Sequence, residues 1–382
     1  MPKIKVENLT KIFGRQPQRA LPLVKQGKAK TDILKETGLT LGVNQASFEV
    51  HAGEIFVIMG LSGSGKSTLV RLLNRLIEPT EGKILIDGTD IVRMNTEQLQ
   101  QVRRKKLGMV FQKFALFPHR TVLENAAYGL EIQGMAKAER EAKAKQSLEL
   151  VGLGGWEASY PDQLSGGMQQ RVGLARALAN EPDVLLMDEA FSALDPLIRK
   201  DMQDELLELQ STMQKTIIFI THDLDEALKI GDRIALMKDG AIVQIGTPEE
   251  IMTNPANEYV ERFVEDVDRS KVLSAENVMK RAETITLDKG PRVALQLMRD
   301  RGVSSLYVVD KKKTLLGVLT ADAVSQAKEQ GQSLEWVLRT EVPKVGPQTL
   351  LNELFDLVAF SDIPVAVTGE HDRLLGVIVK GA

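Results

Sequence analysis

The sequence predicts an α/β fold built on a largely parallel sheet, followed by a smaller α+β unit. Short apolar strand candidates alternate with helical segments through residues 1–265, a pattern typical of a parallel sheet covered by helices. A complete glycine-rich loop at 60–67 follows one of these strands and opens a helix. After a change in composition near residue 266, a weak internal repeat of roughly 60 residues fills the rest of the chain.

The N-terminal segment begins as a strand and is then interrupted. Residues 4–9 alternate apolar and polar side chains, as a half-buried strand does. Residues 15–42 form a basic, glutamine-rich insertion whose purpose does not follow from its sequence. Its helix-like spacing and its glycine stops are at Ile33, Leu34, Gly38 and Gly42.

The middle of the chain supplies the predicted sheet. An apolar run at Glu54–Met59 predicts a buried strand that leads into the glycine-rich loop, and a helix is expected from Lys66 to about Leu76. Further strands are expected at Lys83–Asp87, Gly108–Phe111, Val184–Met187, Thr216–Ile220, Ile234–Met237 and Ala241–Ile245. Helices are expected at 97–106, 137–151, 166–180, 196–213 and 223–230.

The C-terminal part carries the repeat. A polar linker at 266–270 precedes a first copy at 271–328 and a second copy at 329–382. Each copy combines a helix with two strands and a turn, and the second stops at Ala382, where a closing helix would be expected. The paired strands are Ser305–Asp310 with Leu316–Thr320, and Ile363–Val367 with Leu375–Val379.

Composition excludes several classes of protein. Hydrophobic residues make up 43% and charged residues 26% of the 382, as in an ordinary globular protein, and the net charge of −3 gives no general attraction to nucleic acid. Cysteine is absent, which excludes disulfides and thiolate metal sites. The longest strictly apolar run is Ile55–Met59, whereas a membrane span needs ~20 residues. We therefore expect a cytosolic chain that reaches a membrane only through a partner.

The glycine-rich loop predicts a site for a nucleoside triphosphate. Its glycines let backbone N–H groups surround a phosphate, and the following helix N-terminus adds positive potential. The side chain of Lys66 can bridge the β- and γ-phosphates, while the Ser67 hydroxyl can coordinate Mg²⁺. The residues expected to bind the nucleotide here are Gly60, Leu61, Ser62, Gly63, Ser64, Gly65, Lys66, Ser67 and Thr68.

Two adjacent carboxylates end a second apolar strand. The strand Val184–Met187 leads directly into Asp188 and Glu189. Carboxylates at the end of a buried strand are costly unless a cation or water meets them. Beside a phosphate loop, Asp188 is expected to hold Mg²⁺ and Glu189 to act as the general base on the attacking water.

Further motifs make residues 3–265 resemble the ATP-binding subunit of an ABC transporter. They are Gln112, Leu164–Arg171, Ser192–Asp195 and His222, which occur in the order and at the spacing of that family. The resemblance implies a P-loop ATPase domain with a RecA-like core, an antiparallel β subdomain and a helical subdomain. It also implies ATP and Mg²⁺ as ligands, and a head-to-tail homodimer that carries two composite ATP sites.

The resemblance also assigns roles to individual residues. Gln112 would be a catalytic residue and Mg²⁺ ligand that touches a permease, and His222 would contact the γ-phosphate. Phe13 would stack on adenine, although a buried strand-end phenylalanine is nearly as good an interpretation. One departure is Met168, where the signature usually has glutamine. Residues expected to reach the ATP held by the opposite subunit are Ser165, Gly166, Gly167 and Asp195.

The finer resemblance is to glycine betaine/proline importer ATPases. It rests on Arg71–Pro79, Glu189–Pro196 and the insertion at 15–42, and the repeat resembles their tandem CBS module. This implies peripheral attachment at the cytoplasmic face of the membrane through permease subunits, which can be fused to a substrate-binding domain, with Gln112–Asn125 as the docking groove. It also implies regulation by an adenine nucleotide, including a cyclic dinucleotide, at the CBS module, for which a purely structural role in dimerisation is the alternative. The alternatives are an importer ATPase for another amino acid or a choline-like solute, and a soluble ABC ATPase.

Overall fold

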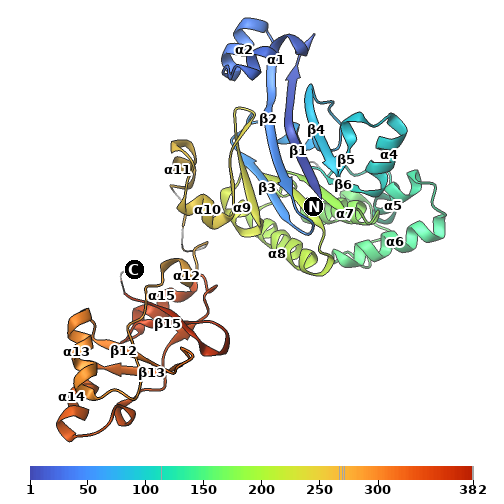
Figure 1. Ribbon diagram of the computed structural model, residues 1–382. Helices are drawn as coiled ribbons and strands as arrows, with labels where there is room; N and C mark the ends of the chain where they lie inside the picture. Colours follow the sequence, from blue (N-terminus) through green and yellow to red (C-terminus); the bar gives the residue numbers. More distant parts are fainter. Residues whose placement is uncertain (113, 266, 269, 271, 381–382) are drawn as a thin grey trace. The chain divides into compact units, whose positions relative to one another are not determined.

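The chain forms two compact units, Met1–Val267 and Asp268–Ala382. The structure is a computed structural model that describes residues 1–112, 114–265, 267–268, 270 and 272–380 (Figure 1). Part of the predicted linker at 266–270, namely residues 266 and 269, lies outside the described residues. In the part of the chain that the structure describes, no helix combines the length and the apolar composition needed to cross a bilayer.

An antiparallel sheet forms one layer of the first unit. Its order is β2-β1-β4-β5. The first two strands are long and pair over most of their length, with irregular steps between Val6 and Ile12. The strand bounds are β1 Ile4–Phe13, β2 Thr40–Val50, β4 Glu81–Ile86 and β5 Thr89–Asp90.

The second layer is a mostly parallel sheet in the order β10-β9-β3-β8-β7-β6. Its central strands β3, β7 and β8 are buried along their whole length, which is why they are continuous apolar runs in the sequence. Only the β9–β10 pair is antiparallel among the pairings described. The bounds are β3 Ile55–Gly60, β6 Leu107–Val110, β7 Val184–Asp188, β8 Thr216–Thr221, β9 Arg233–Lys238 and β10 Ala241–Gly246.

Helices flank this sheet and build a separate helical region. The flanking helices are α3 Lys66–Leu73, α4 Thr96–Lys105, α8 Pro196–Met213, α9 Leu224–Ile230, α10 Pro248–Thr253 and α11 Glu258–Val264. The helical region consists of α5 Val122–Ile132, α6 Lys137–Leu150 and α7 Gly166–Leu178, which pack on one another. The predicted α/β fold with an antiparallel β subdomain and a helical subdomain is therefore confirmed.

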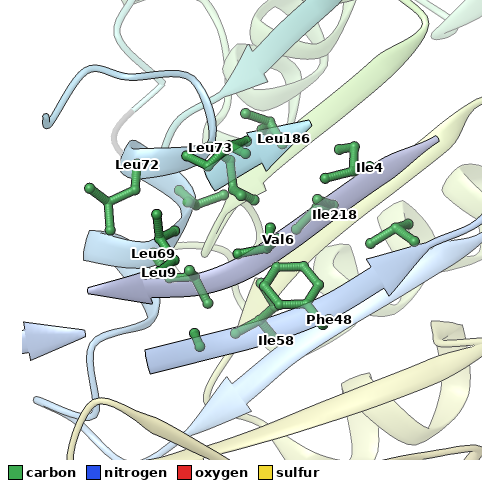
Figure 2. Close-up of a cluster of buried hydrophobic side chains, with 14 of the residues drawn as sticks. Ile4, Val6, Leu9, Phe48, Ile58, Leu69, Leu72, Leu73, Leu186 and Ile218 are labelled. Atoms are coloured by element: carbon green, nitrogen blue, oxygen red, sulfur yellow. The ribbon is translucent and has the colours of Figure 1, made fainter. Parts of the chain in front are cut away.

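The main core lies between the two sheets. Figure 2 shows Ile4, Val6 and Leu9 of β1 meeting Ile58 of β3 and Leu69 of α3. The rings of Phe48 and Phe56 stack with their centroids 5.2 Å apart, which joins β2 directly to β3. This core fixes the antiparallel sheet over the strand and helix that bracket the glycine-rich loop.

The insertion between β1 and β2 is folded and has its own small core. Three short helices, η1 Pro17–Ala20, α1 Leu21–Lys25 and α2 Lys30–Thr37, bury their apolar side chains against the strand ends. Gly38 ends α2 with a φ of 69°, as predicted for a glycine stop. The prediction for Gly42 was wrong, because Gly42 lies inside β2 and the inserted segment ends before Thr40.

The second unit contains two similar halves. Each half has a small sheet, in the orders β11-β12-β13 and β14-β15-β16. The first half comprises α12 Ala275–Val278, β11 Thr284–Ile285, α13 Pro291–Arg301, β12 Ser305–Val309, β13 Leu315–Thr320 and α14 Ala321–Gln330. The second comprises β14 Lys344–Val345, α15 Leu351–Phe360, β15 Val365–Thr368 and β16 Leu374–Ile378.

A shared core joins the two halves of the second unit. Tyr307 and Val318 of the first half pack with Ile363 and Val377 of the second. The Tyr307 hydroxyl donates a hydrogen bond to the Pro364 carbonyl, and burial raises the pKa of this phenol. In the first half α14 follows the last strand. After β16 the structure describes Val379 and Lys380, and the position at which a closing helix would be expected falls on residues 381–382, which lie outside the described residues.

Candidate nucleotide-binding and hydrolysis site

The glycine-rich loop connects β3 to α3 and is tightly packed from behind. Gly60 has a φ of 149°, and a Cβ there would lie 2.3 Å from the Met237 carbonyl oxygen. Gly65 has a φ of 104°, and its Cβ would lie 2.4 Å from the Gly42 carbonyl oxygen. Both positions therefore require glycine, for conformation and for space.

Two hydrogen bonds in series link this loop to Gly240 in the β9–β10 turn and Gly240 to β2. The Gly240 N–H donates to the Ser64 carbonyl (2.9 Å), and the Asn44 N–H donates to the Gly240 carbonyl (2.8 Å). The loop, β2 and the β9–β10 turn are thus held together by backbone contacts. The backbone that would surround a phosphate is set by the fold.

Lys66 lies buried within the loop. Its Nζ donates to the carbonyl oxygens of Gly60 (2.7 Å) and Leu61 (3.2 Å). Burial lowers the pKa of this lysine, while the charges of Glu189 and Asp188 oppose that effect. A buried ammonium between a carbonyl-lined loop and two carboxylates suits an anionic ligand with several oxygen atoms.

A pocket of about 510 Å³ opens over the loop. Predicted residues that line it are Phe13, Ser62, Gly63, Gly65, Lys66, Ser67, Thr68, Glu189 and His222. Phe13 ends β1 and remains 39% exposed, and a Cβ on Gly42 would lie 2.6 Å from its ring. Phe13 is therefore not the buried strand-end residue of the alternative interpretation, and its stacking on adenine stays a prediction.

Asp188 ends β7 beneath this pocket and fits a magnesium ligand. The residue is 4% exposed, and its Oδ1 has no hydrogen-bond partner among the described residues. The nearest cation to Oδ2 is the Arg71 guanidinium at 3.5 Å. The described residues hold no cluster of histidine and acidic side chains that would bind a metal alone. One carboxylate plus the Ser67 hydroxyl and phosphate oxygens is, however, the donor set that Mg²⁺ commonly takes.

Glu189 is the meeting point of the predicted catalytic residues. Gln112 Nε2 donates to Glu189 Oε2 (3.1 Å) and to Ser192 Oγ (3.3 Å). His222 Nδ1 lies 3.6 Å from the same Glu189 oxygen, and its side chain is otherwise exposed to solvent. Glu189 itself follows β7 with a left-handed backbone (φ of 47°), and its side chain lines the pocket. The structure therefore brings together Gln112, Glu189 and His222.

The remaining predicted nucleotide residues lie away from this pocket. Ser165 caps α7 by accepting a hydrogen bond from the Met168 N–H (3.3 Å), and Asp195 caps α8 by accepting one from the Ile198 N–H (3.1 Å). A Cβ on Gly167 would lie 2.6 Å from the Ile198 side chain, so the two caps adjoin. The cap uses only the backbone of Met168, so its departure from glutamine leaves Ser165, Gly166 and Gly167 intact.

The comparisons with known proteins fit this geometry. Family profiles described as "ABC transporter" and "CBS domain" match residues 43–192 and 275–329. The chain is 67% identical to the glycine betaine transport ATP-binding protein OpuAA of Bacillus subtilis, covering 100% of this chain and 91% of that protein. It is 53% identical to the glycine betaine/proline betaine transport system ATP-binding protein ProV of Escherichia coli, covering 99% of this chain and 96% of ProV. The chain belongs to the glycine betaine transport ATP-binding proteins, a group of ABC transporter ATPases.

Solved structures agree with the family. A dimeric ATP-binding cassette, MJ0796, bound to ADP and phosphate has a TM-score of 0.54 and 32% identity, and it covers 64% of this chain and 98% of its own. The match extends over a part of the chain comparable in length to the first unit. As a member of this family, the chain is an ATPase coupled to solute transport and uses ATP with Mg²⁺.

The segment before α5 has a structural anchor in this ABC ATPase. Asn125 is fully buried, and its amide donates to the carbonyls of Phe117 (3.1 Å), Arg120 (3.0 Å) and Thr121 (3.0 Å). Its Oδ1 accepts a hydrogen bond from the Phe117 N–H (2.8 Å), and the ring centroids of Phe117 and Tyr128 lie 4.5 Å apart. The loop beside Gln112 is thus held in one shape, with partly exposed aromatic side chains along it. Whether it docks a permease helix, as the sequence suggested, stays a prediction.

Sequence reasoning missed part of the ATPase pocket. Its wall also includes Lys30, Thr40, Leu41 and Gly42, which come from the insertion and from the start of β2. No local motif marks them, because they reach the loop only through the pairing of β1 with β2. The available signal was the position of Phe13: it is opposite Thr40 in the sheet, so residues near 40 must share its surroundings.

Proposed function

We propose that this chain is the ATP-hydrolysing subunit of an importer for glycine betaine and related compatible solutes. The observation that carries the catalytic part is the convergence of Gln112 and His222 on Glu189, in a pocket floored by the loop around Lys66. Support for the solute comes from relatives named for glycine betaine transport that are 53–67% identical over nearly the whole chain.

In this proposal each residue of the pocket has a distinct task. Lys66 and the loop N–H groups bind the phosphates, and the Phe13 ring stacks on the base. Ser67, Asp188 and Gln112 would hold Mg²⁺, which supplies charge neutralisation for the transferred phosphoryl group. Glu189 Oε2 accepts a proton from the attacking water, and His222 contacts the γ-phosphate when the site is closed.

A homodimer would complete the site. Among the described residues, the pocket lining does not include the predicted trans contacts of the same chain, namely Ser165, Gly166, Gly167 and Asp195. Ser165 and Asp195 are nevertheless exposed and so are accessible to a second chain. A helix N-terminus with free N–H groups suits a phosphate. The dimeric arrangement of the related cassette MJ0796 supports a pairing in which each chain's signature faces the other chain's loop.

In this proposal the transport partner is an integral-membrane permease, either separate from its substrate-binding domain or fused to it. The ATPase then lies peripherally at the cytoplasmic face of the membrane, and the loop Phe114–Thr121 beside Gln112 contacts the permease. The choline transport ATP-binding protein OpuBA of Bacillus subtilis is 38% identical, against 67% for the glycine betaine relative OpuAA, which favours glycine betaine over choline as the solute. No nucleic acid partner is proposed.

The second unit is proposed to regulate transport. A family profile for a CBS domain covers its first half. In the second half a groove of about 900 Å³ includes Phe360, Arg339 and Lys344, and the two cations pair with Asp362 (2.7 Å) and Asp372 (2.6 Å). An adenine nucleotide or a cyclic dinucleotide bound there would stack on the Phe360 ring and would have to compete with these carboxylates for the cations.

Transport by the reconstituted complex tests the proposal. The chain would be purified with its permease in liposomes, and uptake of labelled glycine betaine, proline, carnitine and choline would be compared with ATP inside. We expect glycine betaine uptake that Glu189→Gln abolishes. Uptake of another solute at a higher kcat/KM would overturn the cargo assignment. Regulation is tested by comparing uptake by the full chain and by a chain truncated before Asp268, each with and without cyclic dinucleotide. If the truncation changes neither the uptake nor its response to the dinucleotide, the regulatory role of the second unit is wrong.

A further inference from the structure

The insertion between β1 and β2 forms part of the wall of the nucleotide pocket. Its helix α2 is anchored by Ile33, which is fully buried with Val24 and Leu41 in a separate small core. Lys30 is the first residue of α2 and lies one turn before Ile33 on the same side of the helix. The anchor therefore fixes the point from which the Lys30 side chain extends.

The lysines of the insertion differ in their charge partners. Lys25 pairs with Glu81 (2.7 Å), and Lys28 pairs with Glu36 (2.7 Å). Lys30 has no carboxylate within ion-pair distance among the described residues. Its Nζ instead donates to the carbonyl of Gly63 in the phosphate loop (3.2 Å), and its half-buried side chain lines the pocket.

We propose that Lys30 is a nucleotide-binding residue whose ammonium group contacts the phosphates of ATP. The proposal rests on the proposed nucleotide site. An ammonium group has three donors, and the Gly63 carbonyl uses one, so two remain for phosphate oxygens. Lys66 approaches the loop from inside, whereas Lys30 reaches the same loop from the insertion. The insertion would thus supply a second cation to a ligand that carries several negative charges.

A purely structural role gives different expectations. If Lys30 only held the loop through its hydrogen bond to Gly63, arginine at position 30 would keep the positive charge but would weaken that hydrogen bond. ATP affinity would then fall in K30R as well, and ionic strength would have little effect on the loss. If Lys30 binds phosphate, the affinity for ATP depends on whether the side chain at position 30 is positively charged. The contribution must also fall as ionic strength rises, because this side chain is partly exposed and the Debye length shortens from about 10 Å at 0.1 M toward 3 Å at 1 M.

Binding of Mg·ATP to the full chain tests the proposal. Calorimetric Kd values would be compared for wild type, K30Q, K30R and the matched control K35Q, an exposed lysine on the same helix. We expect K30Q to raise Kd about three- to tenfold at low salt, with the ratio shrinking at high salt. K30R should keep most of the affinity, and K35Q should match wild type. In the ATPase assay the K30Q defect should appear in KM for ATP more than in kcat.

Two results would overturn the proposal. One is an unchanged Kd for K30Q; the other is an equal loss in K30Q and K30R that does not respond to salt, which would indicate a packing role. Lys66→Ala separates this inference from the site on which it rests. If Lys66→Ala abolishes ATP binding while K30Q does not alter it, only the role of Lys30 fails. If Lys66→Ala binds ATP normally, the proposed nucleotide site itself is wrong.

Discussion

Replacing Glu189 by glutamine separates hydrolysis of ATP from its binding. Glutamine keeps the size of the side chain and one oxygen, but its amide does not accept a proton from water. Glu189 Oε2 is the atom approached by Gln112 at 3.1 Å and His222 at 3.6 Å, so the substitution alters the centre of this arrangement. General-base assistance is worth 10²–10⁴-fold, so the barrier should rise by about 2.7–5.4 kcal/mol.

Nucleotide affinity should respond differently. The charge of Glu189 favours the charged form of Lys66 but repels a triphosphate in the same pocket. Removing it leaves the loop contacts of Lys66 in place, so the Kd for Mg·ATP should remain within about threefold of wild type, a small free-energy difference. Because bound ATP then persists, the two-chain form should accumulate in size-exclusion chromatography with Mg·ATP.

Steady-state phosphate release and ATP binding would be measured on the same preparations. Glu208→Gln on α8 is the matched control, since this exposed carboxylate lies outside the pocket and should leave turnover at the wild-type level. Turnover by Glu189→Gln within tenfold of wild type would refute the assignment of the general base. A large loss of ATP affinity would instead indicate that Glu189 organises the binding site.

Other perturbations give separate outcomes. A mixture of Lys66→Ala and Ser165→Ala chains should recover ATPase activity that neither variant has alone, because one site of each mixed dimer is intact; no recovery would contradict shared sites. Asn125→Ala should lower the free energy of unfolding by about 2–3 kcal/mol in urea titrations, because it leaves buried backbone groups of the loop unpaired. Burial raises the pKa of Glu226, so stability should fall as pH rises through that pKa; Glu226→Gln should remove this dependence, and an identical pH profile would contradict it.

Local sequence patterns predicted the parts of the site that one segment contains. The loop from Gly60 to Ser67 and the pair Asp188–Glu189 each follow a buried strand, so an apolar run and its polar end suffice to find them. Their approach to each other also follows, because β3, β8 and β7 are neighbouring parallel strands whose carboxyl ends meet at one edge.

Residues that depend on contacts between distant segments were not predictable. From its neighbours in sequence, Gly42 is expected to end a helix. In the structure it instead lets the β2 backbone lie close to Gly65 and to the Phe13 ring. Lys30 lines the pocket only because Ile33 on the same helix packs into the small core formed with the ends of β1 and β2. By contrast, α5 was absent from the expected helices although a local signal marks it, because Thr121 and Glu124 form a capping box immediately before its apolar face.

The backbone contacts among Gly42, Ser64, Gly65 and Gly240 have a mechanical consequence. They join the antiparallel sheet, the phosphate loop and the β9–β10 turn without any intervening side chain that could change rotamer. Such a junction transmits displacement with little compliance, so the wall bearing Phe13 and the loop bearing Lys66 should move as one body. A change of shape during the ATP cycle must then be absorbed outside this junction, since the junction itself has no side chain that can yield.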